Sequence, residues 1–202
     1  GCGEGTFLNE MRRAGWQVEG VDTSPSAREM ARERYGLRVV APGDWFTGAP
    51  GKYRLVTFWH ALEHVHDVNR YLQAVRDRLE TGGWVIIAAP NYQSYDARRY
   101  RHLWAAYDVP RHLYHFHYPS MTALLYGHGL SVVELKSLPF DSFYISILSE
   151  KRGEGNVIRG LWVGLRSYLS SLSDARASSS IVYVSSPRQR REIGTAERNG
   201  HA

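Results

Sequence analysis

Apolar side chains in the first 90 residues follow two patterns in turn, one typical of helices and one typical of strands. A helical repeat of apolar residues runs from Phe7 to Ala14, and Gly15 follows it as a helix stop. Residues 16–22 (WQVEGVD) then alternate between apolar and polar side chains, as in a half-buried strand. The chain therefore begins with an expected helix followed directly by an expected strand.

The same alternation continues through the first half of the chain. Ser24 and Pro25 provide an N-cap and a first-turn proline, so a second helix is expected to begin here and to end at Gly36. Asp67 is expected to cap a further helix with apolar positions from Val68 to Leu79, ahead of Gly82 and Gly83. Other strands are expected at residues 37–40, 55–59 and 84–89. Strands that alternate with helices predict one α/β domain with a Rossmann-like, doubly wound and mostly parallel sheet.

The pattern loosens after Pro90. Residues 91–118 are rich in aromatic and Arg side chains, and long irregular segments of compact domains are usually functional, so we expect this segment to cover the substrate. Further elements are expected as a helix around 121–125, strands at 130–135 and 181–184, and a helical insert at 140–178. The sequence thus predicts a domain over residues 1–186 and a polar, disordered tail over 187–202.

Composition narrows the class of protein. The net charge of +5 owes much to Arg residues within 187–202, so specific nucleic-acid binding is not expected. The single cysteine, Cys2, excludes an intrachain disulfide and suits a reducing compartment, so we expect a cytoplasmic location. Apolar runs are too short for a membrane span, and none is expected.

A glycine-rich loop opens the chain. Residues 1–5 (GCGEG) precede the first helix, where a chain turns tightly and lets a ligand approach the backbone. Asp22 follows at the end of the next strand, where a carboxylate can accept hydrogen bonds from both hydroxyls of a ribose. A dinucleotide motif would need a third glycine at the position of Thr6, which disfavours NAD. These residues predict a nucleoside-bearing cofactor at the carboxyl ends of parallel strands.

The same residues resemble the class I S-adenosylmethionine-dependent methyltransferases. GCGEG resembles their first motif, EGVDTS at 19–24 their ribose-binding strand, and Gly43-Asp44 their adenine-contacting turn. WHALEHV at 59–65 is similar to their fourth-strand motif, and LETGGWVIIAAPN at 79–91 to their fifth strand. The segments occur in the family's order up to about Leu135. The resemblance implies a sheet whose last strand is antiparallel.

The resemblance also implies S-adenosylmethionine as the cofactor, together with its contacts. Asp22 would bind the ribose, and Asp44 would accept a hydrogen bond from the adenine amino group. Trp45 would lie beside the adenine, or it is an ordinary partly buried aromatic residue. The other contacts are expected from Gly1, Cys2, Gly3, Thr23, Ser24, His60 and Ala61.

One element of the family has no counterpart in the chain. In the family a central first strand precedes the glycine loop, whereas here the loop begins at Gly1. We therefore expect the chain to be truncated at its first glycine motif. The sheet should then have a gap between its two halves, where strand edges expose unpaired backbone groups.

The segment DVPRHLYHF at 108–116 suggests where chemistry takes place. It resembles a D-x-P-R-H-x-x-H-F stretch in a bacterial subset of the family, linked to sugars and quinone-like small molecules, and the resemblance implies that it lies over the cofactor's methyl group. His112 and His115 are candidate general bases, because imidazole titrates near neutral pH. The alternative is that they hold the loop in place by hydrogen bonds. Tyr107 and Arg111 are expected to contact the substrate.

Two histidine patterns are compatible with metal binding, although no metal is expected. His112, His115 and His117 have no Cys or carboxylate at a spacing that suits zinc. His60, Glu63 and His64 can share one helical face. The second pattern resembles a divalent-ion site of some quinone O-methyltransferases, which have an acidic residue in place of His60. Its alternative is a hydrogen-bonded pair at a helix start.

Two further features leave alternatives open. Several arginines in the irregular segment either form a pocket for an anionic substrate or cover a solvated helix face; they are Arg98, Arg99, Arg101 and Arg111. The apolar helix at 157–172 is expected in the core or in a homodimer interface, with a membrane-surface position as the alternative.

The sequence as a whole predicts an enzyme that transfers a methyl group from S-adenosylmethionine to an oxygen or nitrogen of a small molecule. A sugar, a nucleotide sugar and a phenol or quinone-like compound are the expected substrate classes. A non-catalytic binding module with the same fold and an RNA methyltransferase are the alternatives.

Overall fold

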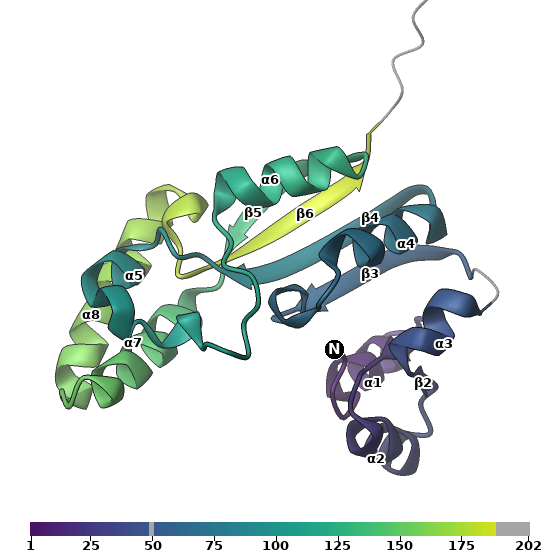
Figure 1. The fold of residues 1–202 in the computed structure, drawn as a ribbon, viewed down its shortest axis with the longest axis horizontal. Helices are drawn as coiled ribbons and strands as arrows, with labels where there is room; N and C mark the ends of the chain where they lie inside the picture. The colour runs from purple at the N-terminus through teal and green to yellow at the C-terminus, as the bar shows by residue number, and fades with distance from the viewer. Residues whose placement is uncertain (49–50, 189–202) are drawn as a thin grey trace, which may run out of the picture.

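The computed structural model describes residues 1–48 and 51–188, and shows an α/β arrangement built on two sheets (Figure 1). A parallel pair, β1 (Gly20–Val21) and β2 (Val39–Val40), forms the smaller sheet. The larger sheet has the order β3-β4-β6-β5, with β3 parallel to β4 and β6 antiparallel to both of its neighbours. Its strands are β3 (Tyr53–Trp59), β4 (Leu79–Pro90), β5 (Leu130–Ser137) and β6 (Ser180–Pro187). The expected antiparallel last strand is confirmed.

Three short helices accompany the smaller sheet: α1 (Thr6–Arg13), α2 (Pro25–Tyr35) and α3 (Pro42–Thr47). The expected N-cap of α2 is confirmed, because the Ser24 hydroxyl accepts a hydrogen bond from the Ala27 N–H. Gly36 ends the helix in the left-handed conformation with φ 63°, which glycine adopts at little cost. Only Gly20–Val21 of the strand expected at 16–22 pairs with another strand, so that prediction was too long.

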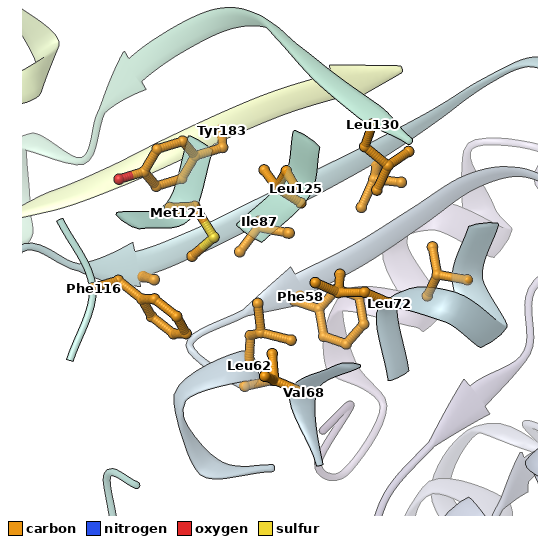
Figure 2. Packing of buried hydrophobic residues seen from close by; sticks show 14 of the residues in the cluster. Phe58, Leu62, Val68, Leu72, Ile87, Phe116, Met121, Leu125, Leu130 and Tyr183 are labelled. Carbon is orange, nitrogen blue, oxygen red and sulfur yellow. The ribbon is translucent and has the colours of Figure 1, made fainter. Parts of the chain in front are cut away.

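The main core lies between the larger sheet and the helices α4 (Val68–Arg78) and α6 (Tyr118–Gly127). Leu72 of α4, Ile87 of β4 and Met121 of α6 are fully buried there, as Figure 2 shows. The Asp67 side chain caps α4 by accepting from the Arg70 N–H, as predicted. Burying such a continuous apolar cluster is the main stabilising contribution to this part of the fold.

Two predicted boundaries were wrong. The helix α4 ends at Arg78, close to its expected end, but β4 begins at Leu79 rather than at Trp84 and includes Gly82 and Gly83. Pro187, the first residue of the expected tail, instead ends β6 and pairs with Leu130 of β5. The strand β6 pairs with β4 on one side and β5 on the other, so backbone hydrogen bonds stabilise it along its length. The polar composition of its last residues does not indicate this pairing. The remaining residues of that predicted tail, 189–202, lie outside the described part of the chain.

The expected gap between the two halves of the sheet is confirmed. Within the described residues, β1 pairs only with β2, and β3 pairs only with β4. A cleft of about 420 Å³ separates them, lined by Val21 on one side, Val56 and Trp59 on the other, and Trp45 and Tyr71. The α1–α3 unit therefore lies to one side of β3, as Figure 1 shows.

The remaining helices gather at the opposite end of the molecule (Figure 1). They are α5 (Tyr95–Tyr100), α7 (Pro139–Arg152) and α8 (Val157–Ser173). Short 3-10 turns follow α5 at Arg101–Leu103 and Ala105–Tyr107, and another follows α8 at Ala175–Ala177. The segment expected to be irregular, 91–118, thus contains a helix and two such turns. One face of α8 is buried and contributes Val163 to the core of this end, as the core interpretation expected, and the other face is exposed. Among the described helices, none is long and apolar enough to cross a membrane.

The buried carboxylate of Asp96 holds this helical end together. Its Oδ2 accepts hydrogen bonds from the Trp104 indole N–H at 2.7 Å and from the Ser179 hydroxyl at 2.7 Å. Its Oδ1 accepts from the Ser167 hydroxyl of α8 at 2.6 Å. A buried charge is tolerated where donors satisfy it, so Asp96 ties α5, α8 and the start of β6 into one unit.

Candidate active site

The glycine loop and Asp22 form one hydrogen-bonded unit. The Asp22 carboxylate is 8% exposed and accepts from the Gly3 N–H at 2.8 Å and from the Ser24 N–H at 2.9 Å. The Cys2 N–H donates to the Val21 carbonyl at 3.1 Å. The structure thus places the loop, the end of β1 and the turn into α2 around one carboxylate, as the sequence predicted.

The loop also reaches the end of β3. A Cβ atom on Gly1 would lie only 2.8 Å from the Cβ of Ala61, so this approach requires glycine at position 1. Gly3 has a φ of +55°, and a Cβ there would meet no atom within 4 Å, so the loop has open space beside it. Gly1 and Gly3, both expected from the sequence, line the cleft beside β1, and Gly1 also approaches Ala61.

The remaining predicted cofactor residues are more dispersed. The thiol of Cys2 packs in a small apolar cluster with Leu8, and burial raises its pKa, which leaves the backbone of Cys2 for any ligand. Thr23 and Asp44 are exposed. Asp44 lies in the first turn of α3, so the turn expected at Gly43-Asp44 is instead helical.

Trp45 takes part in aromatic packing. Its ring stacks on Tyr71 with a centroid distance of 6.3 Å, and the Arg78 guanidinium lies 4.7 Å from the ring centroid. The same ring lines the cleft between β1 and β3. Its contact with an adenine stays a prediction.

His60 lies between two carboxylates at the end of β3. Its Nε2 is 3.0 Å from Oδ2 of Asp141 on α7, and its Nδ1 is 3.5 Å from Oε1 of Glu63. Burial by itself would lower the pKa of His60, but the two carboxylates outweigh it and raise the pKa to about 9. His60 is therefore an imidazolium at neutral pH and holds α7 against the end of β3.

The segment with the D-x-P-R-H-x-x-H-F pattern lies over the carboxyl ends of β3 and β4. The Leu113 N–H donates to the Glu63 carbonyl at 2.8 Å, and the Nδ1 of His64 lies 3.0 Å from the Arg111 carbonyl oxygen. The Tyr92 N–H donates to the Phe116 carbonyl at 3.1 Å. His64 and Arg111 are 47 positions apart in the sequence. The segment and the motif that ends β3 thus come together in space.

The tautomer of His112 is fixed by the backbone. Its Nδ1 lies 2.8 Å from the Ala106 carbonyl oxygen, and a carbonyl only accepts, so Nδ1 carries the proton. In the neutral ring, Nε2 then holds the free lone pair. Burial lowers the pKa of His112 below its ordinary value. His112 is therefore a neutral imidazole that can accept a proton at Nε2 around pH 7.

His115 is oriented differently. Its Nε2 donates to the Tyr107 carbonyl at 2.9 Å, and its ring lines an open groove of about 710 Å³. Arg98, Arg101 and Tyr107 line the same groove. Arg111 pairs instead with Asp108 at 2.7 Å and does not line the groove. The arginines of the segment are thus divided between a groove and a local ion pair.

The three histidines of the first pattern do not come together, whereas Glu63 and His64 of the second pattern do. His115 bonds the Tyr107 carbonyl, and His117 bonds the Ser120 hydroxyl at the start of α6, so neither joins His112. Glu63, His64 and His112 instead each offer one potential ligand atom, and these atoms lie within 4.8 Å of one another. A divalent ion would find two imidazoles and a carboxylate here, a set that suits zinc or iron.

Comparison with known proteins assigns the chain to a protein family. A family model described as a methyltransferase domain matches residues 1–135, which include the glycine loop, Asp22, His60 and His112. The chain belongs to the methyltransferase domain family. Its fold is that of the class I S-adenosylmethionine-dependent methyltransferases, as the sequence predicted.

Curated relatives and solved structures agree with this methyltransferase fold. A ubiquinone biosynthesis O-methyltransferase of Bordetella avium is 33% identical over 99 residues, which cover 45% of this chain and 41% of that protein. The match thus spans about two fifths of the relative's length. Phosphoethanolamine N-methyltransferase 2 of Haemonchus contortus, solved with S-adenosyl-L-methionine, has a TM-score of 0.61 at 18% identity, over 94% of this chain and 47% of that one.

A further solved structure carries a product-like ligand. It is the magnesium protoporphyrin IX methyltransferase of Synechocystis PCC 6803 with bound S-adenosylhomocysteine, with a TM-score of 0.60 at 14% identity. The likeness covers 94% of this methyltransferase domain and 72% of that chain. At such low identity the likeness shows a common fold, and the chemistry has to be argued from the site itself.

Of the two acidic residues that contact His60, only Glu63 was expected from the sequence. Glu63 is fully buried, and neither of its carboxylate oxygens has a hydrogen-bond partner among the described residues. Asp141 reaches His60 from a helix about eighty positions later in the chain. The LEHV motif marked Glu63, but no local signal links Asp141 to His60.

Proposed function

We propose that this domain binds S-adenosylmethionine beside the glycine loop and Asp22, and transfers its methyl group to a hydroxyl of a small molecule. The observation that carries the proposal is the Asp22 carboxylate bonded to the glycine loop, with open space beside Gly3 at the end of β1. Gly1 approaches Ala61 just after β3, and the segment that carries the neutral His112 donates a backbone hydrogen bond to Glu63, two residues beyond Ala61.

The residues present fit such a cofactor. The Gly1 to Ala61 approach leaves no room for a side chain, while the space beside Gly3 is open. A site retained only as a scaffold would tolerate side chains in that space. The openness therefore favours a ligand-binding site over a non-catalytic module.

Asp22 is suited to the ribose. Each carboxylate oxygen accepts one backbone N–H and keeps a lone pair for a further hydroxyl. The bonds to Gly3 and Ser24 hold the carboxylate still, so little ordering is required when a ligand binds. Asp22 would thus bind the ribose hydroxyls and hold the glycine loop in place at the same time.

His112 would act as the general base. When bound, S-adenosylmethionine supplies a methyl group on a positively charged sulfur. Nε2 of His112 would take the proton of the substrate hydroxyl as its oxygen accepts the methyl group; the methyl–sulfur bond would break, and its electron pair would stay on the sulfur of the leaving S-adenosylhomocysteine. The Ala106 carbonyl stabilises the resulting imidazolium, because it accepts from Nδ1. His60 is already protonated by its two carboxylates, so it is a poor base.

A phenolic or quinone-like substrate is the class we favour. The relatives named as ubiquinone biosynthesis O-methyltransferases match 45% of this chain at 31–33% identity. Tyr107 and His115 line the open groove and offer aromatic faces, while Arg98 and Arg101 could bind an anionic group such as a carboxylate or phosphate. A cytoplasmic location, where the cofactor and such substrates meet, is part of the proposal.

Titration calorimetry with S-adenosylhomocysteine tests the cofactor, and transfer of labelled methyl groups to a panel of catechols, amines and sugar nucleotides tests the reaction. Binding together with labelled catechol is the expected result. Absence of binding at millimolar S-adenosylhomocysteine would overturn the cofactor assignment. Labelling confined to amines or sugar nucleotides would overturn the substrate class.

A further inference from the structure

Helix α8 buries its small side chains and exposes its large apolar ones. The buried residues include Gly160, Gly164, Ser167 and Ser171. The exposed ones include Ile158 at 70%, Trp162 at 63% and Leu172 at 62% of their surface. An ordinary surface helix has the opposite arrangement, with Leu and Trp inward and Ser outward. In α8 the large apolar side chains thus lie on the exposed face and the small ones on the buried face.

Close packing against α7 explains the buried face. A Cβ on Gly160 would lie 2.9 Å from the Ile147 Cα, and one on Gly164 would lie 2.7 Å from the Phe143 Cα. Only small residues permit such an approach of two helix backbones. The bond from Ser167 to Asp96 adds a buried polar anchor at 2.6 Å. The large side chains of α8 are thus not needed to hold it in place.

The exposed apolar residues form one stripe. At about 100° per residue, they fall within an arc of about 140° on the side of α8 away from α7. They are Val157, Ile158, Leu161, Trp162, Leu169 and Leu172. A contiguous apolar stripe of this kind marks a docking surface, because water solvates it poorly.

Positive charge borders the stripe. The sequence of α8, VIRGLWVGLRSYLSSLS, holds two arginines and no acidic residue. On the helical wheel Arg159 and Arg166 share one edge of the stripe. Arg159 pairs with Glu150 at 3.3 Å, whereas Arg166 has no acidic partner in the described part of the chain. Lys151 at the end of α7 is likewise exposed and unpaired among the described residues.

We propose that the exposed face of α8 docks on an anionic phospholipid surface, with the helix lying in the plane of the membrane. A stripe of Leu, Ile and Trp edged by basic residues matches the interfacial zone of a bilayer, where apolar side chains enter the acyl boundary and cations meet phosphates. Pairing with a second copy would instead bring two sets of like charges together. The proposal does not depend on the enzymatic reaction.

Co-sedimentation with vesicles tests it. One set consists of phosphatidylglycerol and phosphatidylcholine in equal amounts, and the other of phosphatidylcholine alone. We expect binding to the anionic vesicles that weakens at high salt, and much weaker binding to the neutral ones. The variant Trp162→Ser with Leu169→Ser should lower binding by at least tenfold, roughly the effect expected from losing two buried apolar side chains.

A matched variant controls for surface hydrophobicity. Tyr126 and Val133 are also exposed, at 58% and 53%, but lie on α6 and β5. Tyr126→Ser with Val133→Ser should leave vesicle binding unchanged. Sedimentation velocity without lipid provides the second readout, the oligomeric state of each variant. Both double variants change exposed side chains, so both proteins should fold as the wild type does.

Three results would overturn the proposal. The wild-type protein could stay in the supernatant with anionic vesicles. It could bind neutral and anionic vesicles equally, which would remove the role of charge. It could form a dimer that Trp162→Ser with Leu169→Ser disperses, without any vesicle binding, and the stripe would then be a contact between copies.

Discussion

The Nε2 atom of His60, at the end of β3, lies 3.0 Å from Oδ2 of Asp141 in the first turn of α7. This pair joins the candidate active site to the helical end of the molecule. Burial opposes the charge on His60, yet Asp141 and Glu63 raise its pKa to about 9 from an ordinary value of 6.5. The same contact lowers the pKa of Asp141, although its burial acts in the opposite direction.

The raised pKa predicts a pH-dependent contribution to stability. A raised pKa means that the folded protein holds the proton more tightly than the unfolded chain, so the contribution is complete below about pH 6.5 and is lost as pH rises through about 9. We expect the wild-type melting temperature to exceed that of His60→Gln at pH 6, and the difference to shrink by pH 9.5. Thermal unfolding of both proteins across this range provides the measurement. A constant difference would contradict the ion-pair assignment.

Asp22→Ala should weaken S-adenosylhomocysteine binding by about 1.5–3 kcal/mol, because it removes charge-assisted hydrogen bonds to two hydroxyls. Titration calorimetry measures the change. Asp77→Ala on α4 is the matched control and should bind as the wild type does, since Asp77 contacts Gln73 away from the loop. Unchanged affinity of Asp22→Ala would refute the ribose assignment.

His112→Ala should lower turnover by about 10²–10⁴-fold and leave cofactor affinity nearly unchanged, as expected when a base is lost from an intact site. In the wild type, the rate should rise with pH through a pKa below 6.5 and level off near pH 7. His66→Ala serves as a control, because His66 is an exposed histidine. His115→Ala should lower turnover less, because His115 lines the groove rather than acting as the base. Retention of more than about half of the turnover by His112→Ala would exclude base catalysis.

Removal of divalent ions separates two roles of the same cluster. If His112 accepts the proton, its Nε2 must be free, so EDTA should leave turnover unchanged. Glu63 and His64 lie close enough to His112 to form an ion site with it. EDTA could instead abolish activity, and Zn²⁺ or Mn²⁺ could restore it in the wild type but not in Glu63→Gln. That result would assign His112 as a metal ligand rather than a base.

Asp96→Ala should destabilise the helical end strongly. It leaves the Trp104, Ser167 and Ser179 donors buried without an acceptor, and each such loss costs about 1–3 kcal/mol. We expect a loss of at least about 3 kcal/mol in the free energy of unfolding, measured by urea denaturation. Asp174→Ala, at the exposed end of α8, should cost less than about 1–2 kcal/mol, as the loss of a cap does. Equal losses would show that the Asp96 bonds contribute little.

Local chemistry explains what could be predicted from the sequence. The Ser24 and Asp67 caps, the glycine loop and the antiparallel last strand each depend on a short motif or on the family resemblance, and the structure agrees with them. Asp22 follows from the same logic, because a carboxylate just after a strand reaches the neighbouring loop.

Long-range pairing explains what could not. Asp141 meets His60, and Asp96 meets Ser179, across separations that no periodicity encodes. The apolar pattern of α8 predicted an amphipathic helix, but a pattern cannot tell which face is covered. Here Gly160 and Gly164 decide the buried face, because α7 approaches too closely for larger residues.

The cleft between β1 and β3 has a consequence for amide exchange. The two strand edges on its sides have no partner strand in the described residues, so their amides should exchange with deuterium faster than those between β4 and β6.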